Sequence, residues 1–194
     1  MSLAVETEFG RQSRELPRRS LRVLDVGLAL TGDPDAIEAL ALEWRVIWEG
    51  VGFMSIINHG VSKTVTQRMT DAAKAFHDLP HDVKMSIPVT RDQKGYIPTK
   101  AGITTHSEFH ESRKPDTVEC LVLATDYPAN HPDVVAGKQF YGLMPWLPDA
   151  ALPGFRAAAE EYMTTITDLG RKLLPVWARS LELDADFFDS KFEN

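Results

Sequence analysis

The sequence predicts a fold of the α+β class, rich in helix and with only a few short strands. Residues 33–51 and 154–183 repeat apolar side chains at three- and four-residue spacing, which is typical of amphipathic helices. Three short runs around Val23, Ile56 and Leu121 are rich in β-branched and bulky side chains, which favours strands. Three short strands form only a small sheet, so we expect helices to provide most of the core.

Composition and charge narrow the class of protein. The chain has 194 residues, of which 43% are hydrophobic and 25% charged, as is typical of a soluble domain. A net charge of −7 disfavours nucleic acid or an anionic membrane surface as a partner, because both are bound through clustered Lys and Arg side chains. No apolar run approaches the roughly 20 residues of a membrane span. The single cysteine, Cys120, indicates a reducing compartment, and we expect a cytoplasmic protein.

The chain shows no internal repeat and no linker that would divide it into two domains. Residues 1–20 are polar and without a sustained period, so we expect a mobile N-terminal arm. Residues 21–194 are expected to form one region, and its first element is a short strand at residues 21–26.

The first helix has clear start and stop signals. Asp33 suits an N-cap, and Pro34 suits the first helical turn because its missing N–H would have no partner there. Gly50 and Gly52 lie where the apolar stripe ends, and glycine favours the left-handed conformation that closes many helices. The helix is therefore expected to end just before the next strand.

A strand, a sharp turn and a second helix follow one another from residue 53. Residues 53–57 are apolar apart from Ser55, which predicts a short strand buried on both faces. Asn58 and Gly60 both tolerate left-handed backbone and predict a turn, and Ser62 suits the N-cap of a helix over residues 62–78.

The middle of the chain is less regular. Residues 86–114 contain several proline, glycine and threonine residues and predict a long loop with at most brief strands. A strand is expected at residues 118–124, then a proline-rich connection to the long helix at residues 154–183. Cys120 lies inside that strand, so we interpret it as a small buried hydrophobic residue. Glu119 beside it is interpreted either as a structural residue or as one that supports a side chain of the functional site.

Four segments of the chain together resemble a known family. They read GFMSIINHGV at residues 52–61, FHDLPHDVKM at residues 76–85, GYIP at residues 95–98, and HPD, WLPD and PGFR between residues 131 and 156. In this order they are similar to the N-terminal region of the isopenicillin N synthase-like family of non-haem Fe(II)/2-oxoglutarate-dependent oxygenases. The resemblance covers most of the chain.

The resemblance implies a fold and a reaction for the complete protein. It implies a helix-rich N-terminal portion that flanks a double-stranded β-helix, or jelly-roll, core, and this core is expected to be largely missing because residues 21–194 stop before the metal-binding part. The implied reaction is oxidation of a small organic substrate by hydroxylation, desaturation or ring closure. Fe(II) and 2-oxoglutarate are implied for the complete protein, and neither is expected to bind tightly to this chain alone. Self-association through exposed apolar surface is also expected.

The family's metal signature, His-x-Asp with a distal His, does not occur here. The nearest match is His106 with Glu108, and His110 lies close by in the same polar loop. Two imidazoles and a carboxylate are common metal ligands, so a hydrolytic metal site in this loop stays open as an alternative. A second alternative is a non-catalytic protein-binding module derived from the same fold. We assign no catalytic or metal-binding residue to the chain.

The resemblance does imply substrate-binding residues. In the family the loop around the GYIP segment contacts the substrate, so Gln93, Tyr96 and Ile97 are predicted to line its pocket. Tyr96 offers a flat apolar face and one hydroxyl group, which suit an organic substrate. The alternative for Tyr96 is an aromatic residue that fixes the loop to the hydrophobic core.

Overall fold

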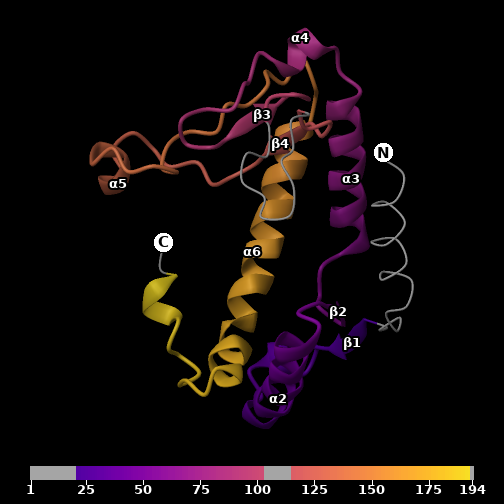
Figure 1. Cartoon of the computed structure of the whole chain (residues 1–194), viewed down its shortest axis with the longest axis vertical. Coiled ribbons are helices and arrows are strands. Elements are labelled where there is room, and N and C mark those ends of the chain that lie inside the picture. The colour runs from indigo at the N-terminus through magenta and orange to yellow at the C-terminus, as the bar shows by residue number, and fades with distance from the viewer. Residues whose placement is uncertain (1–20, 103–114, 193–194) are drawn as a thin grey trace, which may run out of the picture. The chain divides into compact units, whose positions relative to one another are not determined.

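The computed structural model describes residues 21–102 and 115–192 (Figure 1). Its elements in chain order are β1 (Arg22–Asp25), η1 (Ala29–Thr31), α2 (Pro34–Gly50), β2 (Met54–Ile57), α3 (Lys63–His77), α4 (His81–Lys84), β3 (Gly95–Ile97), β4 (Cys120–Val122), α5 (Pro132–Val135), α6 (Phe155–Ser180) and η2 (Asp189–Lys191). The chain divides into two compact units, residues 1–60 with 168–194 and residues 61–167. The mixed, helix-rich architecture predicted from sequence is confirmed.

The first unit is built on two parallel strands. Strand β1 pairs with β2, so that Leu24 lies opposite Ile56. Leu24 is buried against helical residues of α2 and the C-terminal part of α6, and Ile56 packs at the edge of this cluster. The buried members of this cluster are Leu24, Val26, Ala29, Leu40, Ala41, Trp44, Ile47, Leu173 and Val176. The predicted apolar stripes thus form the core of the unit.

Helix α2 begins and ends where the sequence predicts. The side chain of Asp33 accepts a hydrogen bond from the backbone N–H of Ala36 at 2.8 Å, and Pro34 occupies the first turn. At the other end the N–H of Gly52 donates to the carbonyl of Ile47 at 2.8 Å, and Gly52 has a φ of 75°. The N–H of Val51 donates to the same carbonyl, and the left-handed Gly52 turns the chain out of the helix.

The turn after β2 also follows the prediction. Asn58 has a φ of 56° and Gly60 a φ of 76°, both in the left-handed region. The amide of Asn58 donates to Asp25 Oδ2 at 2.7 Å, which ties the turn to the end of the neighbouring strand β1. Ser62 then caps α3 by accepting from the N–H of Thr64 at 3.1 Å.

One expectation for this strand is wrong. Residues 53–57 were expected to be buried on both faces, but Phe53 is 73% exposed and Ile57 is 47% exposed. Val23, opposite Ser55 on the same face, is 58% exposed. In the described part of the chain β2 pairs only with β1, and the core cluster covers only the face that carries Leu24 and Ile56. The other face of this sheet is therefore an exposed apolar surface.

The second unit contains a short antiparallel pair, β3 and β4. Tyr96 lies opposite Leu121, and the N–H of Tyr96 also donates to the carbonyl of Ile87 at 2.8 Å. The predicted strand at 118–124 is confirmed in a shorter form, whereas its pairing with the GYIP segment was not foreseen. The buried cluster of this unit contains Phe76, Ile87, Tyr96, Leu147 and Phe155.

Helix α6 is the longest element, with 26 residues. It contributes Phe155 to the cluster of the second unit and Leu173 and Val176 to that of the first. Its apolar stripe is therefore buried near both ends of the helix, whereas Ile166 between them is 39% exposed. No helix within residues 21–102 and 115–192 has the length and apolar character needed to cross a lipid bilayer.

The exposed face of the β1–β2 sheet leads to a prediction for the 194-residue chain. At roughly 25 cal/mol per Å² of apolar surface, covering the face that carries Val23, Phe53 and Ile57 is favourable by several kcal/mol. We expect the chain to self-associate in light scattering and to bind a hydrophobic dye. Phe53→Ser should reduce both signals without lowering the thermal midpoint, whereas Phe76→Ser, in the buried cluster, should lower the midpoint. A monodisperse monomer that does not increase the fluorescence of the dye would contradict this expectation.

Candidate functional site

The β3–β4 ladder presents two different faces. Side chains alternate along a strand, and directly paired residues share a face. Tyr96 and its partner Leu121 therefore lie on one face, and Ile97 with its partner Cys120 on the other, together with Val122. Tyr96 belongs to the buried cluster of the second unit and the half-buried Leu121 packs against it, whereas the half-buried Ile97, Cys120 and Val122 are not part of that cluster. The ladder thus has an inner, packed face and an outer, apolar and partly open face.

Tyr96 lies in the hydrophobic core and is only 1% exposed. Its ring meets the rings of Phe76 and His81 edge-on, with centroids 5.9 Å and 6.3 Å apart. Its hydroxyl group donates a hydrogen bond to Glu119 Oε2. Of the two roles predicted for this side chain, its placement here matches that of an aromatic residue fixed in the core.

The carboxylate of Glu119 forms hydrogen bonds with polar groups from three other elements. Besides the Tyr96 hydroxyl, Lys84 Nζ donates to both carboxylate oxygens at 3.0 Å, and His77 Nδ1 lies 2.8 Å from Oε1. Lys84 is only 7% exposed and also donates to the carbonyl of His77 at 2.9 Å. We call these four residues the Glu119 cluster. It connects α3, α4, β3 and the residue that precedes β4.

The electrostatics of the Glu119 cluster favour an ionised carboxylate and a neutral phenol. The hydrogen bond from Tyr96, followed by those from His77 and Lys84, lowers the pKa of Glu119 to about 2. Burial, followed by the hydrogen bond to Glu119, raises the pKa of Tyr96 to about 12. Neither group changes its charge between these extremes. The Glu119 carboxylate and the Tyr96 phenol therefore keep fixed charges and are not poised for proton transfer near neutral pH.

Gly95 is required by the packing of the ladder. Its φ is 117°, and a β-carbon built on it would lie 2.6 Å from the carbonyl oxygen of Pro88 and 2.8 Å from that of Ile87. Any side chain at this position would push the segment at residues 87–88 away from β3. The glycine thus permits the close backbone contact that places the next residue, Tyr96, in the core.

The other two predicted substrate-binding residues lie nearer the surface. Gln93 is exposed at the tip of a tight turn, where its N–H donates to the carbonyl of Thr90 at 3.0 Å and its φ is 59°. Ile97 is half-buried on the outer face of the ladder. Gln93, Tyr96 and Ile97 are therefore close in the chain, but Tyr96 points to the opposite face from Ile97.

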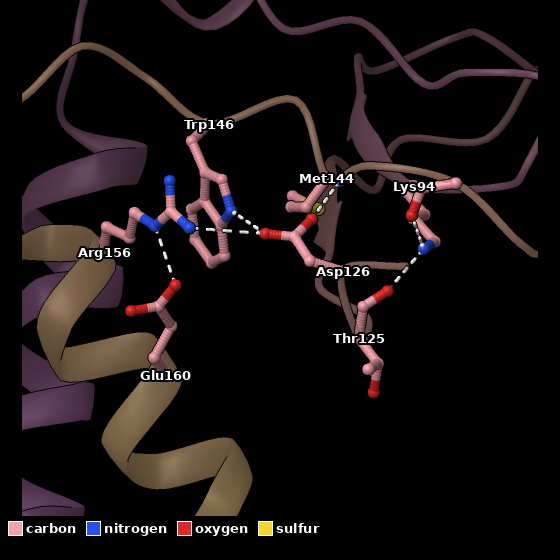
Figure 2. A network of polar contacts seen from close by, with 8 residues as sticks. Lys94, Thr125, Asp126, Met144, Trp146, Arg156 and Glu160 are labelled. Atoms are coloured by element: carbon pink, nitrogen blue, oxygen red, sulfur yellow. Dashed lines mark hydrogen bonds and ion pairs between the residues drawn. The ribbon is translucent and has the colours of Figure 1, made fainter. Parts of the chain in front are cut away.

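A second buried charge, Lys94, was not identified from the sequence. It is 1% exposed, and its ammonium group donates to the backbone carbonyls of Thr125 and Gly142, the latter at 2.7 Å (Figure 2). Burial lowers the pKa of Lys94, while the nearby carboxylates of Asp126 and Asp92 act in the opposite direction. A single lysine in an irregular segment carries no sequence signal of burial, because its partners come from distant residues.

Asp126 forms the neighbouring part of this network. Figure 2 shows its carboxylate between the backbone N–H of Met144, the indole Nε1 of Trp146 and the guanidinium of Arg156. The indole and guanidinium contacts measure 3.0 Å and 3.3 Å. Arg156 also pairs with Glu160 at 2.7 Å and lies over the Trp146 ring. Lys94 and Asp126 together join the two ends of the segment between residues 126 and 144.

The described residues do not supply a metal centre. Within residues 21–102 and 115–192, no group of three or more His, Cys, Asp or Glu side chains could hold a metal ion. The alternative site at His106, Glu108 and His110 lies outside the described residues. Ligands for the Fe(II) implied by the resemblance are thus not found in the described part of the chain.

The Glu119 cluster predicts a pH-dependent stability. Because the pKa of Glu119 falls from 4.5 to about 2 on folding, its contribution is fully present above pH 4.5 and is lost as the pH falls toward 2. We expect Glu119→Gln to lower the free energy of unfolding by about 1–3 kcal/mol at neutral pH. In thermal unfolding, the variant should lose less stability than the wild type between pH 4.5 and about 2, which we call the acid limb. Glu43→Gln, at an exposed ion pair, serves as the control and should leave the profile unchanged. An unchanged acid limb in Glu119→Gln would contradict the assignment.

Known proteins match the chain in sequence and in fold. Residues 21–149 match the family described as the N-terminal region of the non-haem dioxygenase in morphine synthesis. Azadirone synthase LFS of Melia azedarach is 31% identical over 156 residues, which cover 80% of this chain and 45% of that protein. The 2-oxoglutarate-dependent dioxygenase tropC of Talaromyces stipitatus is 31% identical over 73% of this chain and 43% of that protein.

Two solved structures share the fold. A 2OG-Fe(II) oxygenase family protein from Caulobacter crescentus superposes with a TM-score of 0.69 at 22% identity, over 89% of this chain and 52% of that one. T7H of Neurospora crassa, solved in complex with alpha-KG, gives 0.64 at 20% identity over 88% and 50%. The chain spans about half the length of the relatives it matches. It therefore belongs to the family of non-haem 2-oxoglutarate- and iron(II)-dependent dioxygenases, and corresponds to the N-terminal region of its members.

Proposed function

We propose that this chain is the N-terminal part of an Fe(II)/2-oxoglutarate-dependent dioxygenase that oxidises a small organic substrate by hydroxylation, desaturation or ring closure. Within it, the β3–β4 ladder supplies part of the substrate wall. The observation that carries the proposal is a ladder with one face locked into the core and the other apolar and partly open, inside a region that matches the dioxygenase family.

The outer face of the ladder has the chemistry of a pocket wall. Ile97, Cys120 and Val122 present apolar, half-buried side chains, which are typical of surfaces that bind organic molecules once a second surface encloses them. Gln93, two residues before the ladder, adds an exposed amide that can donate or accept a hydrogen bond. Together they supply shape and one adaptable polar group.

Tyr96 supports this substrate wall from the core side of the ladder. Its ring and hydroxyl group are fixed by Phe76 and Glu119, so the backbone of β3 has little freedom to shift. A wall that contacts a reacting substrate is most effective when its own position is rigid, because small displacements misalign the reacting atoms. Gln93, Tyr96 and Ile97 thus act as one unit, with two residues toward the substrate and one toward the core.

The oxidising chemistry belongs to the rest of the protein in this proposal. In the complete dioxygenase, Fe(II) and 2-oxoglutarate would activate O2 to supply the oxidant, and we assign the described residues no part in that chemistry. Their contribution is to orient the substrate and to exclude water from one side of the pocket. Such residues affect substrate placement more than formation of the oxidant.

The first test changes the two faces of the ladder separately in the full-length protein. Ile97→Ala should raise the apparent KM for the substrate and increase the 2-oxoglutarate consumed per product formed, because the substrate is held less firmly. Leu121→Val, on the inner face, should lower the thermal midpoint and leave that ratio unchanged. If Ile97→Ala leaves both KM and the ratio unchanged, the outer face is not a substrate wall.

The second test concerns iron. The 194-residue chain alone is expected to bind Fe(II) only weakly and not to consume 2-oxoglutarate, because its sequence lacks the family's signature of His-x-Asp with a distal His. Calorimetric titration with Fe(II) under anaerobic conditions measures the first, and succinate formation the second. Tight one-to-one binding that is lost in His106→Ala and Glu108→Ala would instead indicate a metal site in the segment that contains these two residues. A full-length protein without any 2-oxoglutarate turnover would favour a binding module.

A further inference from the structure

The segment between Tyr127 and Leu143, which carries α5, leaves β4 and returns before α6. Figure 1 shows it projecting from β3 and β4. We propose that this segment, called here the α5 loop, is a substrate-selecting element, and that Phe140 on it contacts a flat, apolar part of the substrate. The inference rests on the proposed function, because it extends the substrate wall that begins at Gln93 and Ile97.

The base of the α5 loop is closed by buried polar contacts. The N–H of Tyr127 donates to the carbonyl of Gly142 at 3.0 Å, and the buried ammonium group of Lys94 joins the carbonyls of Thr125 and Gly142 (Figure 2). Asp126 holds the returning end of the loop through the N–H of Met144. The two ends of the loop are thus fixed to each other and to the residue that follows Gln93.

Aromatic packing stiffens the interior of the loop. The ring of Tyr127 lies 4.7 Å from that of Tyr141 and 5.0 Å from that of His131, and the last two rings stack at 5.6 Å. Lys94 Nζ lies 5.2 Å from the centre of the Tyr127 ring. Three mutually packed rings and a cation–π contact limit the motion of this loop. Side chains on it are therefore presented on a defined support.

On this rigid loop, Phe140 has a backbone conformation and an exposure that are both unfavourable for its side chain. Its φ is 73°, in the left-handed region that disfavours a bulky side chain, and it is 58% exposed. Leu143, three residues later, is 64% exposed. Left-handed backbone is unfavourable for a non-glycine residue, and exposure of a phenyl group adds a solvation cost. Strain of this kind concentrates at ligand-binding sites.

The α5 loop adjoins the turn that carries Gln93. Arg91 donates to the carbonyl of Gly137 at 3.2 Å, and a β-carbon on Gly142 would lie 2.5 Å from Asp92 Oδ2. Both residues immediately before Gln93 therefore contact the loop. Gln93 itself has a φ of 59°, so two strained, exposed side chains lie on adjoining segments. One offers an amide and the other a phenyl ring.

This pairing indicates a substrate class. A phenyl face favours flat, apolar or aromatic groups, and an amide on the adjoining turn favours a molecule with at least one hydrogen-bonding group. A small aromatic molecule with a hydroxyl or carbonyl substituent fits both. A highly hydroxylated molecule without an apolar face does not.

The experiment measures binding of 2-naphthol, with inositol as the polar control, by calorimetric titration of the full-length protein. Phe140→Gly should weaken 2-naphthol binding about tenfold, since one good apolar contact is worth roughly 1–3 kcal/mol. Its thermal midpoint should stay equal or rise, because glycine relieves the left-handed strain. Phe140→Asn, which also tolerates this backbone, should behave in the same way and guards against a folding defect. Inositol should not bind.

Two variants separate the proposal from simpler explanations. Lys100→Gly relieves a left-handed residue with φ 67°, and Val135→Ala trims a side chain of the same loop that is 74% exposed. Both should bind 2-naphthol like the wild type. Equal binding by Phe140→Gly and wild type, or equal weakening by Val135→Ala, would overturn the role of Phe140. Failure of the proposed function is seen separately, as absence of 2-oxoglutarate consumption by the wild-type full-length protein, and would overturn both.

Discussion

The carboxylate of Glu119 is the interaction on which the second unit depends. A charged group in this setting is stable only if its lone pairs are satisfied, and here three donors reach it from α3, α4 and β3. Two of these donors come from elements that are too short to be fixed by their own apolar burial. The short strand β3 has three residues, and α4 has four. The hydrogen bonds of the Glu119 cluster therefore hold these short elements in place, as extensive apolar burial does for longer elements.

Lys94 and Asp126 also fix an irregular segment through hydrogen bonds to charged groups. A buried ammonium group and a neighbouring carboxylate bind backbone groups at both ends of the α5 loop, so the loop is closed by charge-assisted hydrogen bonds. Lys94 and Tyr96 are separated by Gly95 alone, whose missing side chain lets the backbone at Pro88 approach. Three consecutive residues thus connect the two polar networks, and the candidate substrate wall lies on the segment that both networks hold in place.

Exposed apolar groups have different meanings in different parts of the chain. On the β1–β2 sheet, Val23, Phe53 and Ile57 form one face of a pair of parallel strands, an arrangement that is normally covered on both sides. On the α5 loop, Phe140 is exposed on strained backbone that is held rigid by its neighbours. The first situation is that of a packing surface, whereas the second is that of a contact residue. Backbone conformation and local rigidity distinguish them where exposure alone does not.

The sequence by itself determined the features that depend on neighbouring residues. The caps at Asp33 and Ser62, the left-handed turn at Asn58 and the apolar stripes of α2 and α6 were predicted because each signal lies within a few residues of the structure it specifies. The family motifs also allowed Gln93, Tyr96 and Ile97 to be named as one segment. Only the tertiary structure decided that Tyr96 points into the core toward Glu119, that Lys94 is buried, and that one face of β2 is exposed. These properties depend on partners that are distant in the chain, such as Glu119 for Tyr96 and Gly142 for Lys94, and a pattern of adjacent residues carries no information about which distant groups will meet.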